Sequence, residues 1–177
     1  MARGASLDNA VYLGIDPGQS GGLVALCGDR VALTLMPVTE RDVWDWLKAN
    51  SWITETSRNF AVLELVHSFP HQGIASSFKF GVGFGGLRMA LTGLGIPFAL
   101  VSPQKWQQAM GISPRKKGKR KGKPSGDGWI EIGGESKTQF KNRLKAAAQR
   151  YFPLEKVTLA TADAMLLALY CRRVHHC

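Results

Sequence analysis

The sequence predicts an α/β fold in which a mixed, five-stranded sheet is flanked by helices. Short apolar runs alternate with stretches of helical periodicity in the order three strands, helix, strand, helix, strand, then helices. The chain has 177 residues and is 45% hydrophobic, enough for one domain with a substantial core. We therefore expect a single domain over residues 10–177, preceded by a flexible lead at 1–9.

The first half of the chain predicts an antiparallel meander followed by a crossover. The expected strands are 11–15, 22–27, 31–36 and 60–66. Between the last two, Thr39 resembles the N-cap of a helix that ends near Asn50. A glycine-rich, apolar helix is expected from 74 to 94. The first and fourth strands should lie side by side near the centre of the sheet.

The second half predicts a short strand at 96–101 and three further helices. Ser102-Pro103 is a typical helix start, and Ser136 with Gln139 forms a capping box for a helix that Pro153 ends. The last helix should run from about 161 to 173. Between them, residues 113–134 carry many charges and few apolar residues, which predicts a mobile basic loop.

Charge and cysteine content narrow the class of protein. The net charge of +10 favours a polyanionic partner, most often nucleic acid, although a merely basic soluble protein remains an alternative. The three cysteines form neither a CxxC pair nor a zinc-ligand spacing, which favours a reducing intracellular compartment. The sequence has no apolar run long enough for a membrane span and no signal core at MARGASLDN.

Three carboxylates interrupt apolar segments. Asp16 ends the first strand, Glu64 lies in or at the end of the fourth, and Asp163 lies in the first turn of the last helix. A buried carboxylate is unfavourable unless it is paired, hydrogen-bonded or bound to a metal. Oxygen-rich sites suit Mg²⁺ or Mn²⁺, and two such ions support phosphodiester cleavage. These residues therefore predict a metal-dependent nuclease.

Each carboxylate also has a simpler interpretation. Asp16 precedes Pro-Gly and is compatible with a turn residue, and Asp163 is compatible with a residue that favours the helix N-terminus. Glu64 is harder to explain in this way. The glycines in GIDPGQSGG, at 18, 21 and 22, would let a phosphate backbone approach Asp16 closely.

Several segments resemble RuvC-type Holliday junction resolvases, which have a ribonuclease H-like fold. GIDPGQSGG is similar to their first-strand signature, VLELVHSFPHQG to the second acidic strand, and TADAMLLALY to the last acidic helix. VSPQKWQQAMG and ESKTQFKNRLKAAAQRYFP are similar to the segments between. The pattern is most similar to the plastid (monokaryotic chloroplast) resolvases and to related phage and bacterial proteins.

The resemblance implies a homodimer that binds four-way DNA and makes two symmetric, Mg²⁺- or Mn²⁺-dependent cuts, with two ions in each site. It assigns metal binding and catalysis to Asp16, Glu64 and Asp163. The family has a fourth acidic or histidine residue three positions before the last aspartate, where this chain has Ala160. This departure leaves the metal shell incomplete unless water or another side chain contributes.

Basic and aromatic residues supply the expected DNA contacts. Lys137, at a helix start, is placed to neutralise charge at the scissile phosphate, and a basic run contacts phosphates without reading sequence. Side chains in HSFPHQG are candidates for wedging or stacking at an open junction centre. The expected DNA-binding residues are His67, Phe69, His71, Lys79, Arg115, Lys116, Lys117, Lys119, Arg120, Lys121, Lys137, Lys141 and Lys145. For Lys141 and Lys145, a solvated helix face is an equal alternative.

The sequence thus predicts a crossover junction endodeoxyribonuclease. Two alternatives remain: a catalytically weak protein that binds branched DNA on the same fold, and a ribonuclease H-like nuclease acting on RNA–DNA hybrids.

Overall fold

A five-stranded mixed sheet forms the centre of the molecule. The computed structural model describes residues 10–51, 58–66, 73–122 and 129–175, so the expected lead at 1–9 lies outside it. The strand order is β3-β2-β1-β4-β5; β4 and β5 run parallel to β1, whereas β2 is antiparallel to both β1 and β3. The strands are β1 (Ala10–Asp16), β2 (Gly22–Cys27), β3 (Arg30–Leu35), β4 (Arg58–Glu64) and β5 (Phe98–Val101). The predicted α/β class, the mixed sheet and the adjacency of β1 and β4 are confirmed.

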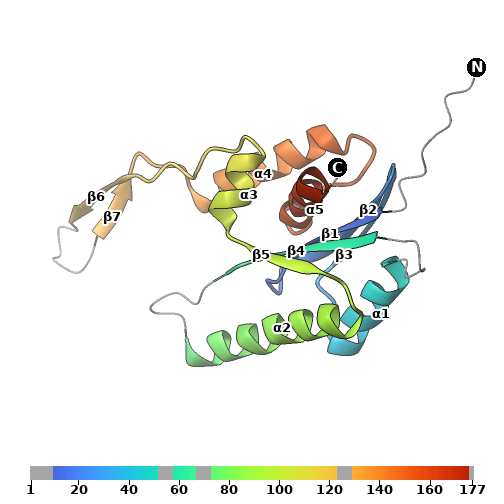
Figure 1. Cartoon of the computed structure of the whole chain (residues 1–177). Coiled ribbons are helices and arrows are strands. Elements are labelled where there is room, and N and C mark those ends of the chain that lie inside the picture. Colours follow the sequence, from blue (N-terminus) through green and yellow to red (C-terminus); the bar gives the residue numbers. More distant parts are fainter. Residues whose placement is uncertain (1–9, 52–57, 67–72, 123–128, 176–177) are drawn as a thin grey trace, which may run out of the picture.

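Helices cover both faces of the sheet (Figure 1). One layer contains α1 (Glu40–Asn50) and α2 (Ile74–Gly93); the other contains α3 (Pro103–Ala109), α4 (Lys137–Tyr151) and α5 (Ala162–His175). Because side chains alternate along a strand, β1 contributes Val11, Leu13 and Ile15 to the first core and Tyr12 to the second. Burial on both faces explains why β1 is apolar up to its last residue, Asp16.

The starts of three helices are those that the sequence predicts. The Thr39 side chain accepts the Asp42 backbone N–H at 3.1 Å, and Ser102 accepts that of Lys105 at 3.4 Å. Ser136 and Gln139 make both bonds of the capping box, at 3.1 and 2.8 Å. These caps satisfy backbone donors that a helix leaves unpaired.

Helix α5 is the central helix of the second layer. Every residue from Ala162 to Cys171 is buried, as expected for a helix without a polar face. It lies directly on β1 at Gly14, where a Cβ atom would be 2.2 Å from both the Ala164 carbonyl oxygen and the Ala168 nitrogen. The missing side chain therefore sets the distance between α5 and the sheet.

The basic segment differs from the loop that the sequence predicts. It contains an antiparallel hairpin of β6 (Lys119–Gly122) and β7 (Trp129–Ile132), and the connection at 123–128 lies outside the described residues. The run WIEI has high strand propensity, and its pairing with KRKG was hidden by the charge of the first strand. Within the described part of the chain, no helix is long and apolar enough to cross a membrane.

Replacing Gly14 with alanine should strongly destabilise the fold. The new methyl group would overlap the α5 backbone, so helix and strand must separate, at about 3 kcal/mol or more of unfolding free energy. Urea unfolding measures the change. Gly83→Ala is the matched control, because a Cβ at Gly83 meets open space within α2. A Gly14→Ala protein as stable as the control would contradict this packing.

Candidate active site

Two acidic side chains are brought together by the parallel pairing of β1 and β4. Ile15 pairs with Leu63, and the next residues, Asp16 and Glu64, end the two strands. The carboxyl ends of parallel strands meet at the same edge of a sheet, where ligands commonly bind. Strand pairing alone therefore fixes Asp16 and Glu64 as neighbours.

The glycines after Asp16 let the chain turn tightly around this carboxylate. The Gly18 N–H donates to Asp16 Oδ1 at 3.3 Å, and Gly21 N–H closes the turn on the Gly18 carbonyl at 2.8 Å. A Cβ at Gly21 would be 2.3 Å from the Asp16 carbonyl oxygen and 2.7 Å from its Cγ. GIDPGQSGG is therefore a strand end whose geometry requires glycine at position 21.

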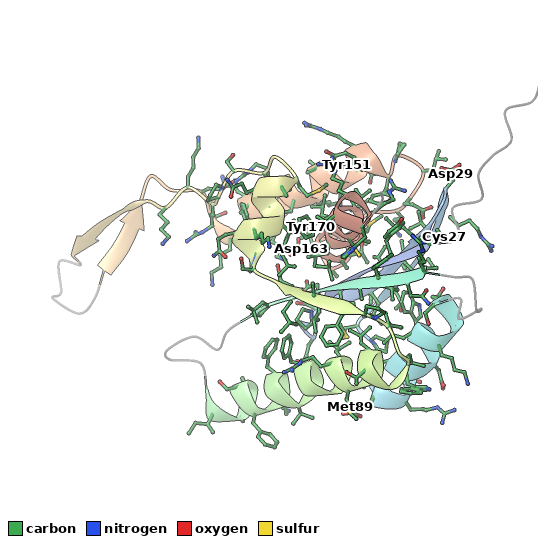
Figure 2. All side chains as sticks on the ribbon, in the orientation of Figure 1. Cys27, Asp29, Met89, Tyr151, Asp163 and Tyr170 are labelled. Carbon is green, nitrogen blue, oxygen red and sulfur yellow. The ribbon has the colours of Figure 1, made fainter. Side chains whose placement is uncertain are left out.

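The third carboxylate comes from the opposite layer. Thr158 and Thr161 bond reciprocally, each backbone N–H donating to the other's hydroxyl at 3.0 and 3.1 Å, and this fixes the turn that starts α5. Asp163, in the next turn, lies between α5 and the sheet (Figure 2). Its Oδ2 is ion-paired with the Lys141 ammonium of α4. Its Oδ1 is buried and has no hydrogen-bond partner among the described residues.

A buried tryptophan holds Glu64. Trp106 of α3 has no exposed surface, and its indole N–H donates to Glu64 Oε1 at 2.8 Å. The bond satisfies the indole and fixes one oxygen of the carboxylate, so that Glu64 is held in one orientation. Trp106 is thus a positioning residue for Glu64.

Burial and mutual repulsion raise the proton affinity of the paired acids. Burial is the main cause that raises the pKa of Asp16 to about 6, and the Asp163 charge adds to it. Burial and then the Asp16 charge raise the pKa of Glu64 to about 7, although the bond from Trp106 opposes this. Burial disfavours the charged form of Lys141, but Asp163, Asp16 and Glu64 outweigh it and raise the pKa of this ammonium. The site holds more negative charge than Lys141 neutralises.

The donor set suits a hard divalent cation. Carboxylate oxygens are the preferred ligands of Mg²⁺ and Mn²⁺, and the unpartnered Asp163 Oδ1 and the elevated pKa values both indicate charge that a cation would stabilise. As it stands, no group of three or more His, Cys, Asp or Glu side chains among the described residues is arranged to hold a metal ion. Lys141 occupies the position of counter-ion to Asp163.

The structure brings some of the predicted DNA-binding residues near this site and not others. Lys141 contacts Asp163, whereas Lys137, one helical turn earlier, is exposed and Lys145 is half-buried. Arg115, Lys116 and Lys117 precede β6, which contains Lys119, Arg120 and Lys121. His67, Phe69 and His71 lie outside the described residues.

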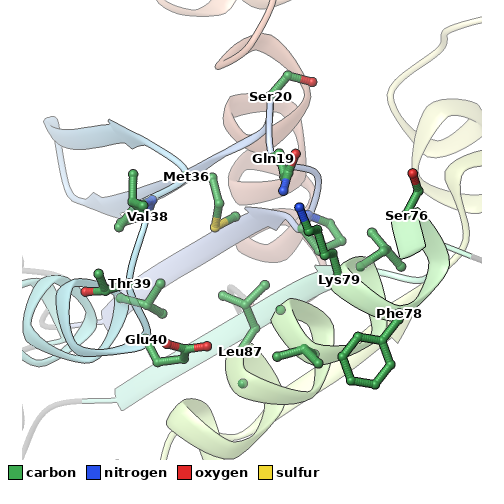
Figure 3. Close-up of a pocket in the computed structure, with 17 residues that line it drawn as sticks. Gln19, Ser20, Met36, Val38, Thr39, Glu40, Ser76, Phe78, Lys79 and Leu87 are labelled. Atoms are coloured by element: carbon green, nitrogen blue, oxygen red, sulfur yellow. The ribbon is translucent and has the colours of Figure 1, made fainter. Parts of the chain in front are cut away.

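Lys79 lies beside a hollow on the other face of the sheet. This cavity of about 750 Å³ runs between the loop after β1, the β3–α1 connection and α2 (Figure 3). Gln19 and Ser20, just after Asp16, also line it, and so does Phe78. None of the three carboxylates does. The hollow therefore adjoins the candidate active site through the Asp16 loop but is separate from it.

Sequence reasoning missed two roles in the site. Lys141, whose predicted DNA contact stays a prediction, pairs with Asp163, and Trp106, which the sequence places in a helix, donates to Glu64. The spacing of Lys137, Lys141 and Lys145 places the three lysines on one helix face, but it does not show which of them pairs with a carboxylate. No local signal distinguishes Trp106 from an ordinary core tryptophan.

Comparison with known proteins identifies the fold. No family model matches the chain, and no curated protein is significantly similar to it in sequence. Among solved structures, Thermus thermophilus RuvC in complex with a Holliday junction substrate aligns with a TM-score of 0.56 and 15% identity, over 93% of this chain and 96% of that one. This chain has the fold of RuvC. A second structure of Thermus thermophilus RuvC aligns with a TM-score of 0.49 and 18% identity, over 90% and 92% of the two chains.

The RuvC likeness confirms the ribonuclease H-like fold that the motifs predict. The alignment spans nearly the whole of both chains. The predicted closeness to plastid and phage proteins stays a prediction.

Removing one carboxylate should stabilise the metal-free protein. Because the pKa of Asp16 is about 6 in the fold and near 3.8 in the unfolded chain, Asp16 destabilises the fold increasingly as pH rises between these values. Asp16→Asn should therefore gain about 1–3 kcal/mol at pH 8 and much less at pH 4. Urea unfolding in EDTA at both pH values measures the difference. Asp29→Asn, at an exposed turn, is the control, and a less stable Asp16→Asn protein at pH 8 would contradict the repulsion.

Trp106→Phe should weaken metal binding while the fold is retained. Phenylalanine fills most of the indole's space but cannot donate to Glu64, so this acid becomes more easily protonated and less fixed. Loss of such a supporting bond typically reduces metal affinity about 10–100-fold. Calorimetric titration with Mn²⁺ measures the loss. Trp44→Phe, on the opposite face of the sheet, should bind Mn²⁺ like the wild type, and equal affinity in both variants would show that the indole bond does not position Glu64.

Proposed function

We propose that this protein is a divalent-metal-dependent endonuclease that cleaves four-way DNA junctions. The observation that carries the proposal is the convergence of Asp16, Glu64 and Asp163, with excess negative charge, on a RuvC fold. The net charge of +10 supports a nucleic-acid substrate. The related structure is described as RuvC in complex with a Holliday junction substrate, which favours branched DNA over hybrids.

Three oxygens are the leading candidates for metal ligands. Asp163 Oδ1 has no other partner among the described residues, while one oxygen of Glu64 is engaged by Trp106 and one of Asp16 by Gly18. The remaining oxygens of Glu64 and Asp16 complete the set. Bound Mg²⁺ or Mn²⁺, in two ions, would activate a water and stabilise the leaving oxygen of a phosphodiester. Ala160 offers no ligand atom, so water or another side chain would complete the coordination.

Lysines of α4 accompany the carboxylates. Lys141 pairs with Asp163 and neutralises part of the negative charge that the carboxylates bring together. Lys137 is exposed one turn nearer the helix start. Its proposed role is to contact the scissile phosphate. The remaining DNA contacts are assigned to Lys79, Lys145, Arg115, Lys116, Lys117, Lys119, Arg120, Lys121, His67, Phe69 and His71.

A homodimer would provide the two symmetric cuts. Helix α2 exposes a stripe of Ile74, Phe78 and Val82, which are 90%, 72% and 48% exposed and follow one another at intervals of four residues. Gly81 and Gly85 lie on the same side of α2, and a Cβ at either would meet nothing within 4 Å. Such an apolar, small-residue face is typical of a helix that packs against a partner.

Two observations favour a second candidate, a junction-binding protein with weak catalysis. Lys141 already pairs with Asp163, and no preformed metal centre is present among the described residues. In that case junctions would be bound tightly without being cut.

Cleavage of a labelled mobile four-way junction tests the proposal. With Mg²⁺ or Mn²⁺ we expect paired, symmetric nicks that EDTA abolishes and that are absent from linear duplex and RNA–DNA hybrid. Asp16→Asn, Glu64→Gln and Asp163→Asn should each lower the rate at least about 100-fold, because each removes a ligand charge, and should retain junction binding. Tight binding without nicks by the wild type would favour the second candidate, and metal-dependent nicking of hybrids alone would establish a ribonuclease H-like activity.

A further inference from the structure

The β6–β7 hairpin is an arm that projects from the body of the protein (Figure 1). The two strands pair with each other and pack on no other described helix or strand to a comparable extent. A two-stranded hairpin without such packing is only marginally stable in water. Its direction must therefore be fixed at its base or by a bound partner.

An ion pair fixes the base of the arm to α4. Arg143 donates from Nε to Glu135 Oε1 at 3.0 Å and from Nη2 to Oε2 at 2.9 Å, the bidentate geometry that arginine forms with a carboxylate. The same guanidinium donates to the carbonyls of Ser113 at 2.9 Å and Pro114 at 3.4 Å. It thus connects α4 with both ends of the arm. We call Arg143 and Glu135 the clasp.

Backbone contacts close the two ends of the arm against each other. Glu135 N–H donates to the Lys116 carbonyl at 2.9 Å, and Arg115 Nη1 donates to the Glu135 carbonyl at 2.8 Å. A Cβ at Gly134 would be 2.3 Å from the Gly118 nitrogen, so the two ends approach as closely as glycine allows. The base of the arm is therefore a defined structure rather than a loose connection.

The clasp joins the arm to the helix that reaches the carboxylates. Arg143 is two residues beyond Lys141, which pairs with Asp163, and both belong to α4. Stacking of Arg143 over the Phe140 ring, at 4.9 Å, holds the guanidinium further. The base of the arm and Asp163 are thus both held by α4, which fixes the direction of the arm relative to the three carboxylates.

The sequence of the arm selects a polyanion as its partner. Residues 114–134 contain seven Lys or Arg and two acidic residues, with the positive charges concentrated before and within β6. A two-stranded ribbon fits the major groove of B-form DNA, and lysine and arginine bind its phosphates without regard to sequence. Duplex DNA is therefore the partner that both shape and charge favour.

We propose that the β6–β7 arm grips one duplex arm of the junction away from the cut, and that the Arg143–Glu135 clasp sets the direction of that grip. This inference rests on the proposed function and deepens it, because it assigns the basic residues of the arm to one duplex away from the cut and gives the clasp a role in directing them. The clasp residues themselves are positioning residues, because both already use their charged groups on each other.

Junction binding in EDTA, measured by fluorescence anisotropy over a series of salt concentrations, tests the arm. In the arm variant, Lys117, Lys119 and Arg120 are replaced by glutamine. We expect the slope of log affinity against log salt to become shallower by about 2–3, as for the loss of three phosphate contacts. The matched control replaces Lys48 of α1, Arg58 of β4 and Arg88 of α2, which are exposed outside the arm, and should shift the slope much less.

Arg143→Gln tests the clasp. Alone, it should weaken junction binding several-fold and shorten the hydroxyl-radical footprint on one duplex arm. When Arg143→Gln is combined with the arm substitutions, it should have almost no further effect on junction binding, because the arm's contacts with the duplex are already lost. A merely structural role of Arg143 would instead produce the same loss in both backgrounds.

Each result decides the proposal. An arm variant that behaves like its control, or an Arg143→Gln effect that is additive with the arm substitutions, would overturn it while leaving junction cleavage by the wild type intact. A wild-type protein that does not bind four-way DNA would overturn the proposed function and the arm's role together.

Discussion

The parallel pairing of β1 and β4 is the constraint on which the site depends. It places Asp16 and Glu64 at adjacent strand ends, inside a region where burial raises both pKa values. The neighbouring contacts limit the resulting instability. Trp106 donates to Glu64, Gly18 donates to Asp16, and Lys141 pairs with Asp163. Because strand pairing holds Asp16 and Glu64 together, the surrounding contacts serve to stabilise their negative charge.

The same sheet sets the position of the third acid through a backbone contact. Gly14 lies two residues before Asp16, and its lack of a side chain allows α5 to approach β1. Asp163 lies on that helix, so Gly14, which has no functional group, determines the distance between Asp163 and the carboxylates of the sheet. Strand β1 therefore provides both the close packing against α5, through Gly14, and part of the charged site, through Asp16. The buried charge that the proposed function requires lowers the stability of the fold.

Sequence patterns predicted the parts of the site that depend on local structure. Asp16 and Glu64 interrupt apolar strands, and parallel strands place their carboxyl ends together, so their proximity followed from the pattern. Trp106 and Lys141 contact residues 42 and 22 positions away, and no periodicity reports such a contact. The hairpin was not predicted for a different reason. A highly charged segment has the composition of a disordered loop, and the run WIEI forms a strand only because it pairs with β6.

Helix α4 connects the chemistry of the site with the shape of the expected substrate. Its first turn is fixed by the capping box, Lys141 reaches Asp163, and Arg143 holds the base of the basic arm. A nuclease for linear duplex needs only a groove at the cut. A nuclease for branched DNA must also sense where a second duplex leaves the branch, and an arm whose base is fixed to α4 would supply that information. The placement of both functions on one helix is the physical reason to expect selectivity for branches from this fold.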